Sequence, residues 1–259
     1  MDHNSTPLLE MKGVEKHFGG VRAIDHFDLQ VMPRDIYGLI GPNGAGKTTI
    51  FNTITGIYRA DEGQILFEGK DITKIKPHDA AALGIARTFQ NIRLFGNLSV
   101  NMNVIIACNM HNRYTMAEAL LRLPRYRKVT KAVEERAMNF LESVGLTDKA
   151  DDIASSLPYG HQRKLEIARA MATDPKLLLL DEPAAGMNEE ESLELVEFLK
   201  KLHRDNPITI LMIEHHMDVV SRLCGQCTVL DFGRTLAQGT VEEVKQNESV
   251  VAAYLGGEL

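Results

Sequence analysis

The stretch that most constrains the fold of this chain is GLIGPNGAGKTTIF, residues 38–51. It holds the pattern G-x-x-x-x-G-K-T from Gly41 to Thr48, after an apolar run typical of a strand and at the start of a helical pattern over residues 47–56. Glycines allow backbone N–H groups to turn inward around phosphate oxygens, and the helix start adds the positive end of its dipole. The stretch therefore predicts a phosphate-binding loop in a strand–loop–helix unit.

The loop predicts a nucleotide and a metal ion as its ligands. We expect Lys47 to place its charge on the β- and γ-phosphates and the Thr48 hydroxyl to bind Mg²⁺. A guanine site would normally carry N-K-x-D, and because the sequence has no such run, adenine is favoured and ATP is the expected ligand. The residues expected to contact it in this loop are Gly41, Pro42, Asn43, Gly44, Ala45, Gly46, Lys47, Thr48 and Thr49.

A second acidic element, KLLLLDEP at residues 176–183, fits the same chemistry. An apolar strand ends in Asp181, where a carboxylate can orient Mg²⁺. Glu182 follows directly and can accept a proton from the water that attacks the γ-phosphate. The alternative is an acidic pair that only caps a helix after the strand.

Strand and helix patterns alternate outside one long segment. Strands are expected at 8–18, 23–31, 36–40, 65–69, 84–90, 176–182, 208–214 and 227–232. Residues 189–204 and 216–224 are helical in pattern, and so is the charged segment 101–157. This alternation of strands and helices predicts a parallel sheet with helices on both faces. Within the early strands, apolar and polar residues alternate more than in the later ones, which favours a small antiparallel sheet. LLLL and ITILMI are apolar throughout, as in strands buried on both sides.

Composition excludes several classes of protein. The chain has 259 residues, 44 % of them hydrophobic, and a net charge of −6, whereas a nucleic-acid binder is usually basic. No apolar run is long enough to span a membrane, and MDHNSTPLLE does not resemble a secretory signal, so we expect a cytoplasmic chain. The pair Cys224 and Cys227 is either a redox or zinc site, or two buried small residues.

The phosphate loop, LLLLDEP and SSLPYGHQRKLEIARA (155–170), in this order, resemble the nucleotide-binding subunits of ABC transporters, from about Leu8 to Leu255. The resemblance implies one P-loop ATPase domain over residues 1–259, with a mixed-sheet β/α core at 8–90 and 160–259, an N-terminal antiparallel β subdomain and an inserted helical subdomain at 91–159. It also implies two such domains facing head to tail, with ATP between the phosphate loop of one and the signature of the other. A second ATPase chain, identical or different, is therefore an expected partner.

The resemblance assigns roles to three further positions. Phe18 matches the aromatic residue that stacks on adenine, Gln90 the glutamine that senses the metal and the attacking water, and His215 the histidine that bonds the γ-phosphate. Together with Glu182 and Lys47, Gln90 and His215 form the expected catalytic set, and Thr48, Gln90 and Asp181 the expected Mg²⁺ set. Phe18 as a core aromatic and His215 as a structural histidine are the alternatives.

Two segments depart from the family pattern. The signature usually begins L-S-G-G-Q, but here Pro158 replaces the serine and cannot donate an N–H. Gly160 remains where a helix is expected to begin, so backbone N–H groups and the helix dipole still offer an anion site there. In AAGMN, Ala185 and Asn188 replace the serine and aspartate of S-A-L-D, which puts the usual contacts between subunits in doubt.

Three segments, HFGGVRAID, RTFQNIRLF and VAAYLGGEL, and the tyrosine form of the signature are similar to the ATP-binding subunits of branched-chain amino acid importers, in particular the longer of their two ATPases. This resemblance implies integral membrane permease subunits as partners, an external substrate-binding protein acting indirectly, no nucleic acid, and a peripheral position on the inner face of the cell membrane. The alternatives are the ATPase of a lipopolysaccharide exporter, a soluble non-transport ABC ATPase and a non-hydrolysing regulatory domain.

The segment 109–131 is rich in basic residues, and it either faces the permease or lipid headgroups or is a solvated helical surface. These residues are Arg113, Arg122, Arg125, Arg127, Lys128 and Lys131.

Overall fold

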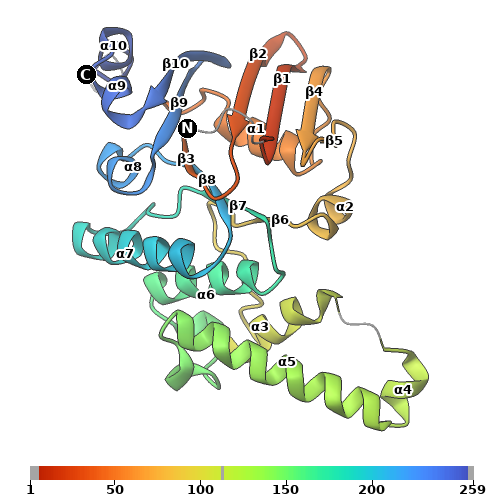
Figure 1. Cartoon of the computed structure of the whole chain (residues 1–259). Helices are drawn as coiled ribbons and strands as arrows, with labels where there is room; N and C mark the ends of the chain where they lie inside the picture. Colours follow the sequence, from red (N-terminus) through yellow and green to blue (C-terminus); the bar gives the residue numbers. More distant parts are fainter. Residues whose placement is uncertain (1–5, 112–113, 256–259) are drawn as a thin grey trace. The chain divides into compact units, whose positions relative to one another are not determined.

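The computed structural model describes residues 6–111 and 114–255. The chain divides into two compact units, one formed by residues 1–90 and 176–259 and the other by residues 91–175 (Figure 1). Among the described residues, no helix is both long and apolar enough to cross a membrane.

A six-stranded sheet forms the centre of the first unit, with the strand order β10-β9-β3-β8-β7-β6. Its strands are β3 (Ile36–Ile40), β6 (Ile85–Arg87), β7 (Leu177–Asp181), β8 (Thr209–Ile213), β9 (Gln226–Asp231) and β10 (Arg234–Thr240). All neighbours pair in parallel except β10, which is antiparallel to β9. Every residue of β7 and β8 is buried, which confirms that these apolar runs are strands covered on both faces.

The first unit also contains the antiparallel sheet expected from the early strands. Its order is β2-β1-β4-β5, with β1 (Leu9–Phe18), β2 (Val21–Val31), β4 (Glu62–Phe67) and β5 (Lys70–Asp71). Buried and exposed residues alternate along the second half of β2, where the buried ones are Phe27, Leu29 and Val31. This pattern arises because one face of the sheet packs on the core and the other meets solvent. The core cluster joins residues of both sheets with Ile50 and Phe51 of helix α1 (Lys47–Ile54).

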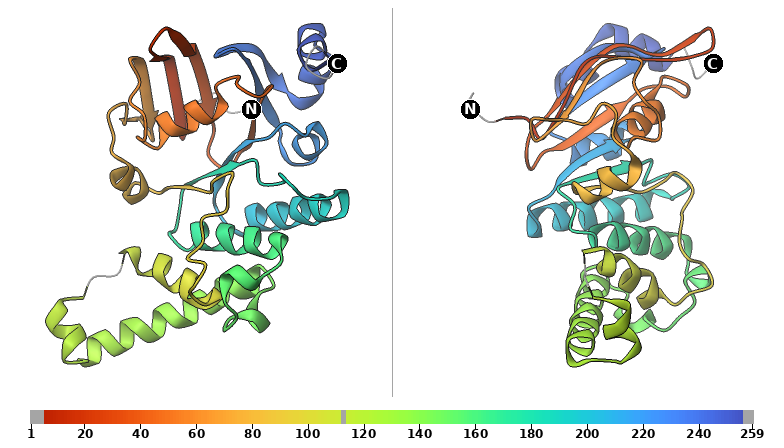
Figure 2. Two further views of the ribbon diagram at one scale, coloured as in Figure 1. Left: turned by 180° about the vertical axis from the view of Figure 1, so that it is seen from behind. Right: turned by 90° about the vertical axis from the view of Figure 1, so that its right-hand side faces the viewer.

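The other helices of the first unit flank the sheets or follow them at the C-terminal end (Figure 2). They are α2 (Pro77–Ala82), α7 (Glu189–Asp205), α8 (Met217–Leu223), α9 (Val241–Lys245) and α10 (Glu248–Leu255). Helix α7 begins with a capping box, in which the Asn188 side chain accepts from the Glu191 N–H and Glu191 binds the Asn188 N–H in return. Asn188 thus caps this helix as well as an aspartate would.

The second unit is helical. It contains α3 (Val100–Cys108), α4 (Met116–Leu120), α5 (Pro124–Ser143) and α6 (Tyr159–Met171), with short 3₁₀ turns. Helix α5 buries Val133, Ala137 and Leu141 at four-residue spacing, so a single stripe faces α3 and α6. In α6 and at its end Leu165, Ala168 and Ala172 are buried, as predicted.

The structure differs from the sequence prediction in two respects. Helix α6 packs on α3 and α5, so the helical unit extends to residue 175 instead of returning to the core at residue 160. Five short elements, α2, β5, β10, α9 and α10, were not predicted. Strand β10, for example, has the mostly polar sequence RTLAQGT and owes its strand conformation to pairing with β9.

Candidate functional site

Four segments that carry predicted site residues meet at one edge of the parallel sheet. Strands β3, β8, β7 and β6 are neighbours in that order and run in the same direction, so their carboxyl ends lie at the same edge. The phosphate loop follows β3, His215 comes shortly after β8, Glu182 follows β7 and Gln90 comes shortly after β6. Strand order therefore places these segments side by side, where ligands of α/β sheets usually bind.

The backbone of the phosphate loop follows a path that requires glycine at two positions. Gly41 and Gly46 have φ values of 148° and 104°. A Cβ at Gly41 would lie 2.2 Å from the Leu230 carbonyl oxygen, and one at Gly46 would lie 2.4 Å from that of Ala23. Any other residue would be strained and would clash, so the loop conformation depends on these glycines.

Lys47 is held at the base of the loop. Its Nζ donates to the carbonyl oxygens of Gly41 at 2.6 Å and Pro42 at 2.9 Å. Burial lowers the pKa of the Lys47 ammonium, and nearby carboxylates, that of Glu182 first, oppose this shift. The ammonium is thus desolvated and fixed before any phosphate arrives, which strengthens its interaction with an anion.

A pocket of ≈ 250 Å³ lies over this loop. Most of its lining belongs to the predicted contact set: Ala23, Asn43, Gly44, Ala45, Gly46, Lys47, Thr48, Thr49, Gln90 and Glu182. The donors of the loop fit a polyphosphate, and hydroxyl, amide and carboxylate oxygens beside them fit Mg²⁺. The residues present therefore suit the nucleotide and the metal ion that the sequence predicts.

Glu182 lies between two other members of the predicted catalytic set, Gln90 and His215. The Gln90 side-chain amide donates to Glu182 Oε2 at 2.7 Å, and His215 Nδ1 lies 4.0 Å from Glu182 Oε1. Glu182 does not cap the next helix, because α7 begins after Asn188, which is its N-cap. The His215 side chain is 41 % exposed, so it is available to a ligand.

Asp181 has a partner that the sequence did not reveal. Its Oδ2 accepts from Arg87 at 2.7 Å, and both side chains are buried. Arg87 also donates to Asn52 Oδ1 at 2.7 Å, which ties it to helix α1. The only signal in the sequence was a basic residue in a short apolar strand; its role depends on the pairing of β6 with β7.

Phe18 ends strand β1 and is 42 % exposed, so it is not a core aromatic. Its ring lies edge-on to Tyr58, with centroids 5.0 Å apart, and the Lys16 ammonium is 5.4 Å from its centroid. A partly exposed aromatic ring of this kind can stack on a planar base.

The signature segment, in the second unit, runs from the end of a 3₁₀ turn through nearly all of α6, and Tyr159 and Gly160 lie in the first turn of that helix. Pro158 is the N-cap and supplies no side-chain hydrogen bond. A Cβ at Gly160 would meet nothing within 4 Å, so packing within this chain does not demand glycine there. The Tyr159 hydroxyl accepts from Arg163 at 3.1 Å, and Arg163 pairs with the buried carboxylate of Glu166 at 2.7 Å. The tyrosine variant thus orders the start of α6 through a network of its own.

The basic segment is solvent-facing where the structure describes it. Arg122, Arg127 and Lys128 are exposed, as are Arg125 and Lys131, which pair with nearby glutamates. Arg113 lies outside the described residues.

Comparison with known proteins identifies the family. A family model described as ABC transporter matches residues 24–185, and one described as branched-chain amino acid ATP-binding cassette transporter matches residues 234–259. The high-affinity branched-chain amino acid transport ATP-binding protein LivG of Escherichia coli (strain K12) is 41 % identical over 97 % of this chain and 99 % of that protein. The protein of the same description from Pseudomonas aeruginosa, BraF, is 40 % identical with the same coverage.

Among solved structures, the ADP conformation of an ATP-binding cassette of an ABC transporter matches with a TM-score of 0.84 and 32 % identity. The match covers 97 % of this chain and 100 % of that chain. The predicted fold class, an ABC ATPase with a mixed sheet and an antiparallel β sheet, is confirmed. The chain therefore belongs to the ABC transporter family, as one of its ATP-hydrolysing subunits, and within it to the group of branched-chain amino acid transport ATP-binding proteins.

Proposed function

We propose that this chain hydrolyses ATP to energise the import of branched-chain amino acids, working on the inner face of the cell membrane. Its partners would be permease subunits in the membrane, a second ATPase chain and, indirectly, an external substrate-binding protein. The identity of 41 % over 97 % of the chain with LivG supports this substrate class, as does the match at residues 234–259. The match covers 99 % of that relative's length, which supports a transport subunit over a soluble ATPase with long insertions.

The observation that carries the chemistry is the convergence of Gln90 and His215 on Glu182 beside the phosphate loop. In this proposal Phe18 stacks on adenine, the loop N–H groups and Lys47 hold the phosphates, and Glu182 accepts the proton of the attacking water. Gln90 orients that water and His215 bonds the γ-phosphate.

Thr48, Gln90 and Asp181 are the residues that would hold Mg²⁺, which when bound neutralises charge on the phosphate oxygens. Asp181 enters this role already fixed in orientation by Arg87. Gly160 would act in a second ATPase chain, where the first turn of α6 offers backbone N–H groups to the ATP held by the partner's loop. ATP would then stabilise the closed dimer, because only that state contacts it from both sides.

The direct test is reconstitution of this chain with its permease in proteoliposomes. We expect ATP hydrolysis and uptake of labelled leucine, isoleucine or valine, both stimulated by the binding protein. Lys47→Ala is the control that should abolish both. Hydrolysis stimulated by a different solute, with no uptake of branched-chain amino acids, would refute the substrate assignment and leave the ATPase assignment intact.

A further inference from the structure

Glu214 is a buried acidic residue to which the sequence assigned no role. It follows the last residue of β8, and its side chain is 0 % exposed. An ionisable side chain is almost never fully buried unless partners hold it. The partners of Glu214 therefore indicate what this carboxylate does.

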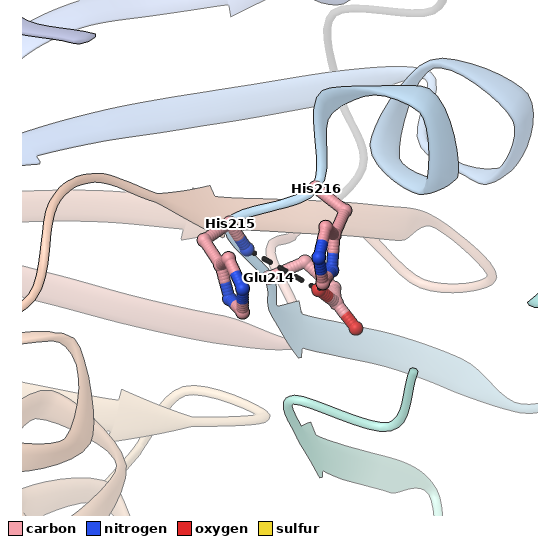
Figure 3. A group of neighbouring side chains, drawn as sticks. All are labelled: Glu214, His215 and His216. Carbon is pink, nitrogen blue, oxygen red and sulfur yellow. Dashed lines mark hydrogen bonds and ion pairs between the residues drawn. The ribbon is translucent and has the colours of Figure 1, made fainter. Parts of the chain in front are cut away.

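The Glu214 carboxylate connects two segments of the site. Its Oε1 accepts from the backbone N–H of Ala184 at 2.9 Å, and its Oε2 accepts from the backbone N–H of His215 at 3.2 Å. His216 Nδ1 lies 3.4 Å from the same Oε2 (Figure 3). One side chain thus binds the loop after Glu182 and the segment that carries His215.

These contacts begin where the backbone ladder of the sheet stops. Strands β7 and β8 pair up to Asp181 and Ile213, and the Glu182 N–H donates to the Ile213 carbonyl oxygen at 3.0 Å. Two residues further on, the Ala184 N–H has the Glu214 carboxylate as its acceptor. The side chain of Glu214 therefore continues the connection between the two strands past their last backbone hydrogen bond.

Glu182 needs such support because of its backbone conformation. Its φ is 47°, a left-handed conformation that is strained for a residue with a Cβ. Conformations of this kind persist only where the surroundings hold them. The backbone at Glu182 is held on both sides of this conformation. The Glu182 N–H donates to the Ile213 carbonyl oxygen, and the N–H of Ala184, two residues later, donates to the Glu214 carboxylate.

We propose that Glu214 is a positioning residue for ATP hydrolysis: its buried carboxylate holds the loop after Glu182 against the histidine segment and so maintains the 4.0 Å approach of His215 to Glu182. Glu214 is not itself a catalytic residue, since it is fully buried and both of its oxygens are engaged by backbone groups. The proposal rests on the proposed role of this site in hydrolysis.

The test measures ATP hydrolysis by the full chain assembled with its permease. In Glu214→Ala the Ala184 N–H loses its acceptor, and we expect kcat to fall about 10- to 100-fold. KM for ATP and binding of a fluorescent ATP analogue should stay within about twofold of wild type, because the phosphate loop is untouched. In Glu214→Gln the amide oxygen can still accept from Ala184, so kcat should recover to about three- to tenfold below wild type.

Glu197→Gln, an exposed exchange on α7, is the matched control and should leave kcat and the thermal unfolding midpoint unchanged. A double variant completes the design. Adding Glu214→Ala to His215→Ala should lower kcat much less than Glu214→Ala lowers it in the wild-type chain, because both substitutions disturb the same placement of His215 beside Glu182.

Three results would overturn the proposal: kcat of Glu214→Ala within twofold of wild type, a rise in KM without a fall in kcat, or fully additive losses in the double variant. If Glu214→Ala does not fold, Glu214→Gln decides, and wild-type kcat in that variant would refute the positioning role. Absence of hydrolysis in the wild-type assembly would instead contradict the proposed function.

Discussion

Gln90 donates a hydrogen bond to the carboxylate of Glu182 at 2.7 Å although the two residues lie 92 positions apart in the sequence. Gln90 comes shortly after β6 and Glu182 directly follows β7, and these strands are parallel neighbours. The Gln90 amide thus occupies Glu182 Oε2 as a hydrogen-bond donor, while Glu182 Oε1 is the oxygen that lies toward His215. In the proposed function, the carboxylate held in this way would accept a proton from a water bound in the adjacent pocket.

Glu182→Gln should lower kcat at least ~100-fold, since a general base typically contributes that much or more. The amide retains the size of the side chain, and its oxygen can still accept from Gln90, so ATP should still bind and the ATP-bound dimer should accumulate. Size-exclusion chromatography in ATP and Mg²⁺ measures the dimer, and phosphate release measures turnover. Wild-type turnover in this variant would remove Glu182 from the base role.

Gly160→Asp should abolish hydrolysis in the assembled transporter without unfolding the chain. The site of the missing Cβ is open within this chain, and an acidic residue in the first turn of a helix favours helix formation. The added carboxylate would, however, repel the phosphates of an ATP presented by the partner subunit. Unfolding followed by circular dichroism and steady-state ATPase activity separate the two effects.

Pro158→Ser is the matched control for Gly160→Asp, because it restores the usual family residue two positions away and should be tolerated. If Gly160→Asp kept full activity, the first turn of α6 would not be a phosphate site between subunits.

Arg87→Met should destabilise the first unit by about 3 kcal/mol, because it leaves the buried Asp181 carboxylate without its cation. Mg²⁺ with ATP should restore more stability to this variant than to wild type, since a bound cation replaces the missing charge. Urea unfolding with and without Mg²⁺ and ATP measures both quantities. Arg222→Met, which removes an exposed arginine, is the control and should change stability by less than about 0.5 kcal/mol. An unchanged midpoint for Arg87→Met would show that the Arg87–Asp181 pair is not a stabilising contact.

All three cysteines should react slowly with thiol reagents in the native chain. Cys108, Cys224 and Cys227 form no disulfide and are buried, and burial raises the pKa of Cys227 to about 11 and that of Cys224 further. Because the thiolate is the reactive form, the fraction available at pH 8 is about one in a thousand for Cys227. Ellman's reagent should label three thiols only after denaturation. Rapid labelling of the C-x-x-C pair in the native chain would favour the redox alternative.

Several features were readable from the sequence because they are local. The phosphate loop needs only a strand, Gly41 and Gly46 at a fixed spacing, and a helix start, and all of these lie within 38–51. The unbroken apolar sequences of β7 and β8 indicated strands that are buried on both faces. The family, and with it the set of candidate site residues, followed from such motifs and their order along the chain.

Strand order and side-chain contacts were decided only by the tertiary structure. The order β3-β8-β7-β6 determines which loops share an edge, and no residue pattern within a strand states which strand lies beside it. The pairing of Arg87 with Asp181 spans 94 positions and that of Glu214 with Ala184 spans 30, and each depends on the register of neighbouring strands. Local sequence determines which backbone forms and which side chains it carries, whereas packing of distant strands determines which of those side chains meet.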